Sequence, residues 1–159
     1  MDEIKKALEV AFVQHREQKR KDGKTPYIVH IHDVVKYLLS EPNVPKEVVI
    51  AGILHDTLED THYTEDEIER EFGKSVLELV LFVTEKKKVF ISEGEKKSSW
   101  KMRKSAAVEE CQEATREQLL LKLADKLANL QSIKEDYIVE GEAFWDRFNA
   151  PKEDIKWYC

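Results

Sequence analysis

The sequence contains little cysteine, glycine or proline, and each scarcity narrows the class of protein. Its 159 residues include two cysteines, Cys111 and Cys159, which lack the spacing of a zinc site built from thiolates. In a reduced compartment such a pair is usually two free thiols. Five glycines and four prolines, beside 42% hydrophobic and 36% charged residues, suit one helical domain with strongly charged outer faces.

The sequence also lacks a long apolar run and an excess of positive charge. No segment is long enough to cross a membrane as a helix, and the acidic start, Met1-Asp2-Glu3, is unlike a signal peptide. We therefore expect a cytoplasmic protein without a membrane partner. The formal net charge of -6 disfavours nucleic acid as a partner, because a phosphate backbone selects basic surfaces. The runs Lys19-Arg20-Lys21 and Lys86-Lys87-Lys88 are either local binding sites for a small anion or solvated helix ends and loops.

The pattern that is present is helical. Apolar residues recur at three- and four-residue spacing along most of the chain, which predicts an all-α fold in a single domain over residues 1–159. Thr64 and Glu67 predict a capping box at the start of one helix, and Gly73 predicts its end. The expected helices cover residues 2–21, 27–40, 45–56, 65–72, 75–84, 98–114 and 116–137, with a last one after residue 149. Residues 85–97 are expected to form either a mobile loop beside the site or an ordinary surface loop.

The predicted helix over residues 116–137 carries the densest row of large apolar side chains. We expect six of them to form a core stripe: Leu119, Leu120, Leu123, Leu127, Leu130 and Ile133. Asp125 lies within this row, where a carboxylate is costly unless it is paired or bound to a metal. Asn129 follows four residues later, so the two polar side chains can face one pocket.

An adjacent His55-Asp56 pair follows the apolar entry of the third helix. It supplies an imidazole and a carboxylate to one cation, and Glu59 and Asp60 follow its members by four residues each. In a helix that step puts side chains on the same face about one turn apart, so two ligands would lie beside two further acids. Taken alone, such a pair is more often a buried, hydrogen-bonded pair than a metal site.

Two more polar groups complete a plausible ligand set. His30 lies on the second predicted helix and Asp125 on the long one. Two imidazoles and two carboxylates, with no thiolate, suit Mn²⁺ or another divalent cation in octahedral geometry better than structural zinc. The order His, His-Asp, Asp resembles the pattern of the HD phosphohydrolase superfamily.

The resemblance is closer to one branch of that superfamily. Several blocks in order are similar to the hydrolase domain of Rel/SpoT enzymes and to the small alarmone hydrolases: Arg20-Lys21-Asp22, Thr25-Pro26-Tyr27-Ile28, Leu54-His55-Asp56-Thr57 and, in residues 122–130, Lys-Leu-Ala-Asp-Lys-Leu-Ala-Asn-Leu. The resemblance implies an HD-type helical fold and a hydrolase that removes pyrophosphate from the 3′ position of (p)ppGpp, giving GDP or GTP. We expect no synthetase domain in a chain of this length.

The same resemblance implies roles for ten residues. The metal ligands would be His30, His55, Asp56 and Asp125. The catalytic acids would be Glu59 and Asp60. The contacts to the nucleotide would be Arg20, Lys21, Tyr27 and Asn129. For Tyr27 an aromatic that packs a turn is an equal alternative, and His15, His32 and His62 are interpreted as packing, surface or loop residues.

Two departures from the family pattern keep other functions open. The proline that usually follows the first metal histidine is absent, and Glu85 is followed by three lysines in place of a more acidic run. One alternative is an HD phosphohydrolase for another nucleotide, such as NADPH, a dNTP or a nucleoside monophosphate. The other is a regulatory module that binds a nucleotide without turning it over. The sequence predicts no oligomeric state.

Overall fold

The computed structural model describes residues 2–85, 100–148 and 150–158. Over these ranges the regular structure is helical apart from one isolated bridge between Lys19 and Pro26, which confirms the predicted all-α fold. The elements are α1 (Asp2–Gln14), α2 (Ile28–Leu39), α3 (Lys46–Leu54), α4 (Thr57–Asp60), α5 (Glu65–Phe72), α6 (Lys74–Val83), α8 (Trp100–Glu109), η1 (Glu110–Glu113), α9 (Arg116–Glu140), η2 (Gly141–Arg147) and α10 (Lys152–Tyr158). No helix among them is both long and apolar enough to span a membrane.

The chain divides into two compact units. The first contains Met1–Glu85 and Arg116–Asn129, and the second contains Lys86–Thr115 and Leu130–Cys159. The single domain expected over residues 1–159 stays a prediction. Of the loop expected at residues 85–97, all but Glu85 lies outside the residues that the structure describes, as does the second lysine run.

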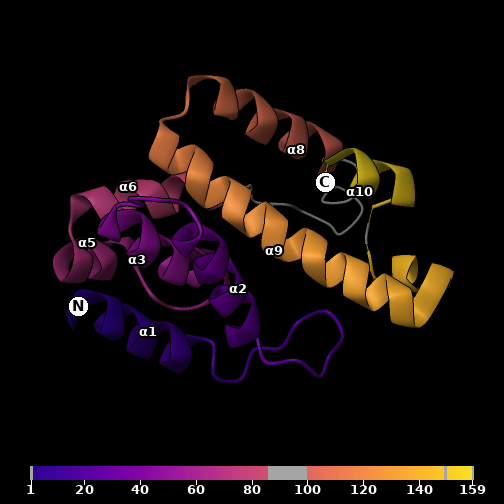
Figure 1. The fold of residues 1–159 in the computed structure, drawn as a ribbon, viewed down its shortest axis with the longest axis horizontal. Helices are drawn as coiled ribbons and strands as arrows, with labels where there is room; N and C mark the ends of the chain where they lie inside the picture. Colours follow the sequence, from indigo (N-terminus) through magenta and orange to yellow (C-terminus); the bar gives the residue numbers. More distant parts are fainter. Residues whose placement is uncertain (1, 86–99, 149, 159) are drawn as a thin grey trace. The chain divides into compact units, whose positions relative to one another are not determined.

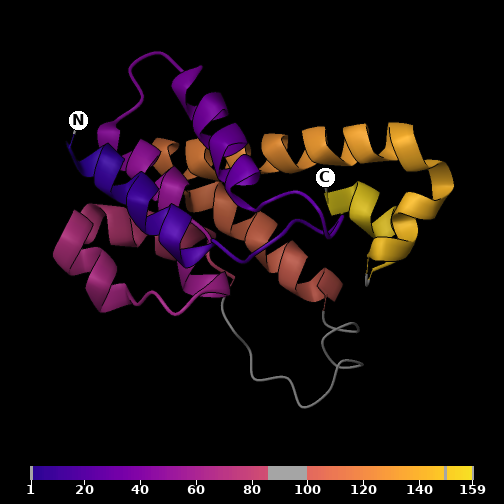
Figure 2. The ribbon, with the colours of Figure 1, turned by 90° about the horizontal axis from the view of Figure 1, so that it is seen from below.

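The core of the first unit is organised around α3. Every residue from Val48 to Leu54 is buried, and α3 packs against α1, α2 and α6. Figures 1 and 2 show α1 to α6 gathered into one group. Gly52 permits the close approach of α2, because a Cβ atom at this position would lie 2.4 Å from Cδ1 of the buried Leu38. The helix that leads into the His55-Asp56 pair is therefore buried and closely packed against α2.

The first helix ends earlier than predicted, at Gln14 rather than at residue 21. Residues 18–27 instead form a tight hairpin-like loop, in which the backbone N–H of Tyr27 donates to the carbonyl of Gln18 at 3.0 Å. The Asp22 carboxylate accepts from the backbone N–H groups of Lys24 and Thr25 at 2.8 and 2.9 Å. Such local side-chain bonds compete with a helix, which is why the basic run lies in a loop.

The expected core stripe of the long helix is wrong for three of its members. Leu119, Leu123 and Leu127 are 40%, 55% and 37% exposed. α9 instead buries Leu121, Ala124 and Ala128. Small alanines let the helix backbone lie close to its neighbours, and a face of two alanines and one leucine is a weaker apolar signal than a row of leucines. The rotation of the helix places Asp125, next to the buried Ala124, at the edge of the core.

The second unit has an aromatic cluster of its own. Phe144 is 2% exposed, and its ring contacts those of Tyr137, Trp145 and Phe148. Arg147 forms ion pairs with Asp136 and Glu140 on α9. The final helix after residue 149 is confirmed as α10, in which Ile155 is buried.

Candidate metal centre

The His55-Asp56 pair lies at a break between two helices. α3 ends at Leu54, and Asp56 has φ -101° and ψ 1°, in the sparsely populated bridge region where many active-site residues lie. The Thr57 hydroxyl donates to the carbonyl of Leu54 at 2.7 Å and stabilises the break. His55 is 3% exposed, so the break points its imidazole into the unit rather than toward solvent.

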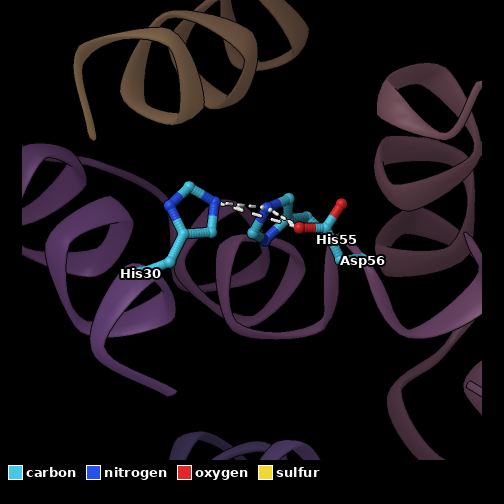
Figure 3. Close-up of side chains that lie close together, drawn as sticks. All are labelled: His30, His55 and Asp56. Carbon is cyan, nitrogen blue, oxygen red and sulfur yellow. Dashed lines mark hydrogen bonds and ion pairs between the residues drawn. The ribbon is translucent and has the colours of Figure 1, made fainter. Parts of the chain in front are cut away.

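Three of the predicted metal ligands converge at this point. The Nε2 atoms of His30, from α2, and His55 lie 3.3 Å apart. Oδ2 of Asp56 lies 2.7 Å from Nε2 of His55 and 3.9 Å from Nε2 of His30. Figure 3 shows the two rings and the carboxylate facing one another. One ligand atom from each residue lies within 4.8 Å of the others, which is close enough for all three to bind one cation.

The fourth predicted ligand comes from α9. Oδ1 of Asp125 lies 3.2 Å from Nε2 of His30 and 3.8 Å from Nε2 of His55. The side chains of α2, of the α3–α4 break and of α9 therefore meet at one place, although Asp125 is far from the others in the sequence.

The charges at this site are strongly coupled. Burial lowers the pKa of His55, but the charge and hydrogen bond of Asp56, with the charge of Asp125, outweigh burial and raise that pKa to about 9. Burial raises the pKa of Asp56, but the charge and hydrogen bond of His55 and the hydrogen bond of Tyr27 hold it well below its usual range. Burial lowers the pKa of His30. Two carboxylates in this setting are stabilised by one positive charge, which a proton on His55 or a bound cation can supply.

The donor atoms fit a cation. Nδ1 of His55 lies 2.9 Å from the carbonyl oxygen of Gly52, and that oxygen can only accept a hydrogen bond. Nδ1 therefore carries the hydrogen, and in the neutral ring Nε2 presents a lone pair toward His30 and Asp56. A backbone carbonyl that fixes the tautomer of a histidine in this way is the usual partner of a metal-binding imidazole.

Neutral and basic side chains lie beside the ligand set and form hydrogen bonds with it or with one another. The Tyr27 hydroxyl donates to Oδ2 of Asp56, and burial together with the Asp56 charge raises the pKa of Tyr27. Asn129 donates from Nδ2 to Oδ1 of Asp125 at 2.6 Å, and it accepts on Oδ1 from a guanidinium nitrogen of Arg20 at 3.1 Å. Three of the four predicted nucleotide contacts are thus tied to the metal ligands or to one another.

The two predicted catalytic acids are exposed on α4. Oε2 of Glu59 accepts from the backbone N–H of Glu85 at 3.3 Å, and Oδ2 of Asp60 accepts from Nε2 of Gln18 at 2.8 Å. Lys21 is exposed in the loop after α1. Sequence analysis assigns no role to Gln18, although a position three residues after His15 allows a contact between the two side chains.

Comparison with protein families gives one match that covers most of the chain. The model of the HD domain matches residues 7–146. Among curated relatives, the human guanosine-3′,5′-bis(diphosphate) 3′-pyrophosphohydrolase MESH1 is 39% identical over 133 residues, which is 82% of this chain and 69% of that protein. The guanosine-3′,5′-bis(diphosphate) 3′-pyrophosphohydrolase of Aquifex aeolicus is 38% identical over 132 residues, 83% of this chain but 18% of that protein.

Two solved structures share the fold over most of the chain. A metazoan ortholog of SpoT that hydrolyses ppGpp aligns with a TM-score of 0.72 and 29% identity, covering 92% of this chain and 85% of that one. The crystal structure of lmo0812 from Listeria monocytogenes aligns with a TM-score of 0.68 and 36% identity, covering 81% of this chain and 77% of that one.

Proposed function

The chain belongs to the HD-domain family, and from that premise we propose that it is a metal-dependent hydrolase of guanosine 3′,5′-bis(diphosphate) and its 5′-triphosphate form. It releases pyrophosphate from the 3′ position and leaves GDP or GTP. The observation that carries the proposal is the meeting of His30, His55, Asp56 and Asp125 at one helix break. The names of relatives that align with four fifths of the chain supply the substrate.

The metal in this proposal is Mn²⁺ or another divalent cation, held by His30, His55, Asp56 and Asp125. The mixed nitrogen and oxygen donors, without a thiolate, favour Mn²⁺ over structural zinc. When bound, such a cation lowers the pKa of water and neutralises phosphate charge. Three groups orient the proposed ligands: the backbone carbonyl of Gly52 orients His55, the Tyr27 hydroxyl orients Asp56 and the Asn129 side chain orients Asp125.

Glu59 and Asp60 handle the proton in the proposed reaction. Either carboxylate can accept a proton from the water that attacks the 3′-linked phosphorus. As the new oxygen–phosphorus bond forms, the bond from that phosphorus to the ribose 3′ oxygen breaks, and the 3′ oxygen gains a proton. The exposure of both acids on α4, directly after the ligand pair, supports this role because a proton acceptor needs access to solvent and substrate.

Four residues bind the nucleotide in this proposal. Tyr27 and Asn129 contact the ligand set, Arg20 contacts Asn129, and Lys21 follows Arg20 in the same loop. Cζ of Arg20 lies 5.8 Å from the centre of the Tyr27 ring. The guanidinium group supplies a planar, permanently charged fork for phosphate or base. This basic loop would reverse the sign of the overall charge locally, so an anionic substrate is compatible with a net charge of -6.

The proposed partner is therefore a small nucleotide, with no nucleic acid and no membrane. We also propose a cytoplasmic location, because a nucleotide with two diphosphate groups does not cross a membrane unaided and must be hydrolysed in the compartment that contains it.

A substrate panel tests the proposal. Products from ppGpp, pppGpp, NADPH, dNTPs and nucleoside monophosphates are separated by chromatography, with and without Mn²⁺. We expect Mn²⁺-dependent conversion of ppGpp to GDP and pyrophosphate. Turnover of another nucleotide would retain the metal mechanism and overturn the substrate. Metal binding without turnover of any member would favour a regulatory nucleotide-binding module.

A further inference from the structure

His15 and Gln18 lie beside the candidate site without an assigned role. His15 is 3% exposed, and its ring stacks on that of Tyr27 with centroids 4.9 Å apart and planes at 28°. Its Nδ1 atom lies 2.5 Å from Oε1 of Gln18. Its Nε2 atom is buried and has no hydrogen-bond partner among the described residues. An apolar ring would pack here at lower cost, so stability alone does not explain a histidine.

Gln18 connects this buried ring to an acid on a different helix. Its Nε2 atom donates to Oδ2 of Asp60 at 2.8 Å, across 42 positions of sequence. Its backbone is held at both ends, because its N–H donates to the His15 carbonyl at 2.9 Å and its own carbonyl accepts from Tyr27 at 3.0 Å. The amide of Gln18 is therefore a fixed bridge rather than a free surface group.

The chemistry of the two groups determines which way this amide faces. Oε1 of Gln18 can only accept, so Nδ1 of His15 carries the hydrogen. The Asp60 carboxylate can only accept a hydrogen bond, so it holds the NH₂ group of Gln18 toward itself and leaves Oε1 facing His15. The Nδ1–H group of His15 then donates to Oε1 and fixes the other end of the amide.

We propose that His15 and Gln18 are positioning residues that hold the Asp60 carboxylate in its reactive orientation. The inference rests on the proposed function, in which Asp60 accepts or orients a proton. Asp60 is the last residue of a four-residue helix and is exposed, so its side chain would otherwise sample several rotamers. With Oδ2 bound to Gln18, Oδ1 is left for water, and a proton acceptor works only within hydrogen-bond reach of its target.

A double-mutant cycle tests the bridge between Gln18 and Asp60. Gln18→Leu should lower kcat about tenfold or more, which is the lower end of the loss seen when a residue that orients a functional side chain is removed. KM should change by less than about twofold. In the background of Asp60→Asn, Gln18→Leu should cause no further loss, because the two residues act as one unit. Gln14→Leu is the matched control: Gln14 lies at the end of α1, and its side chain forms no hydrogen bond with any described residue. Unchanged kcat in Gln18→Leu, or losses that multiply with those of Asp60→Asn, would overturn the proposal.

Variants of His15 separate the hydrogen bond from packing. His15→Phe keeps a ring against Tyr27 but removes Nδ1–H, so it should lower kcat as Gln18→Leu does. His15→Asn places an amide NH₂ near the position of Nδ1 and should recover part of the lost kcat. If His15→Phe retained full kcat, the histidine would be a packing residue, as first interpreted from the sequence.

A measurement that does not depend on turnover separates this inference from the proposed function. In ¹⁵N-histidine NMR spectra of the Mg²⁺-loaded protein, His15 should be the Nδ1–H tautomer, and Gln18→Leu should shift it toward the Nε2–H tautomer. An Nε2–H tautomer in the unmodified protein would overturn the bridge whatever the substrate. If ppGpp is not hydrolysed but another nucleotide is, the cycle is run on that nucleotide. Absence of turnover across the panel would overturn the proposed function and the catalytic role of the bridge. The tautomer of His15 would still test whether the hydrogen bond from His15 to Gln18 forms.

Discussion

Each carboxylate of the candidate metal centre is bound by a neutral side chain from another part of the chain. Tyr27 donates to Asp56, and Asn129 donates to Asp125. A donor at a fixed angle orients the carboxylate and stabilises its charged form. At the scale of single residues, the geometry of the candidate site therefore depends on Tyr27 and Asn129 as well as on the carboxylates that they bind.

Removal of the Tyr27 hydroxyl should weaken metal binding. Tyr27→Phe keeps the ring that stacks on His15 but removes the donor to Asp56. We expect the affinity for Mn²⁺ to fall about tenfold, at the low end of the loss seen when a group that hydrogen-bonds to a metal ligand is removed. Titration calorimetry measures it, with Tyr37→Phe on α2 as the control for loss of a hydroxyl. Equal affinities in the two variants would show that Asp56 is oriented without Tyr27.

Neutralisation of Glu59 should separate binding from turnover. Glu59→Gln keeps the shape of an exposed side chain on α4 but cannot accept a proton. We expect Mn²⁺ binding to be retained and kcat to fall about 10²-fold or more. Initial rates and a metal titration on the same sample measure both. Full activity of this variant would remove Glu59 from the mechanism.

At the scale of helices, spacing predicted where helices exist better than which face they bury. The capping box at Thr64 was predicted and is present in full. The end of α1 was missed because the bonds of Asp22 are made to a backbone that is already turned. The leucine face of α9 was misjudged because periodicity cannot distinguish a row of exposed leucines from a row that packs. The contacts of Gln18, Tyr27 and Asn129 connect distant segments, so no local pattern contains them.

A matched pair of leucines on α9 tests the observed face. Leu121 is 0% exposed and Leu123 is 55% exposed, and the substitution to alanine is chemically the same at both. Leu121→Ala should lower the free energy of unfolding by about 2–5 kcal/mol, because it leaves a cavity. Leu123→Ala should change it by less than about 0.5 kcal/mol. Denaturant unfolding of both variants measures the two changes. A larger loss in Leu123→Ala than in Leu121→Ala would support the predicted leucine stripe.

The capping box of α5 should make part of the stability depend on pH. The hydroxyl and backbone N–H of Thr64 hold the pKa of Glu67 below its ordinary value of 4.5. Between the lower, folded pKa and the unfolded pKa of 4.5, the unfolded chain binds more protons than the folded chain. The stabilisation is therefore present above pH 4.5 and is lost as the pH falls through the folded pKa. Glu67→Ala should therefore destabilise the protein more at pH 7 than at pH 3. Thermal unfolding at the two pH values measures the difference, and an equal loss at both would show that the carboxylate charge does not contribute.

At the scale of the whole molecule, the match to the HD domain extends over residues 7–146, while the ligand set lies within the first compact unit. Three segments of that unit carry the proposed ligands: α2, the break after α3, and the first half of α9. A cation bound by all three would hold together parts of the chain that are distant in sequence. Metal binding should therefore be visible in the stability of the folded chain as well as in its activity.

Addition of Mn²⁺ should raise the melting temperature, and Asp125→Ala should abolish that rise together with activity. A ligand that binds only the folded state stabilises it by about 2.7 kcal/mol at a hundred times its Kd, which corresponds to roughly 5–10 °C for a chain of this size. Removal of the Asp125 carboxylate leaves three of the four proposed ligands. Asp33→Ala is the control, since the Asp33 carboxylate lies on α2 against the exposed His32. Scanning calorimetry over a metal titration measures the shift. If Asp125→Ala kept the full Mn²⁺-dependent rise, the cation would be bound without α9, and the segments that it joins would be only α2 and the helix break.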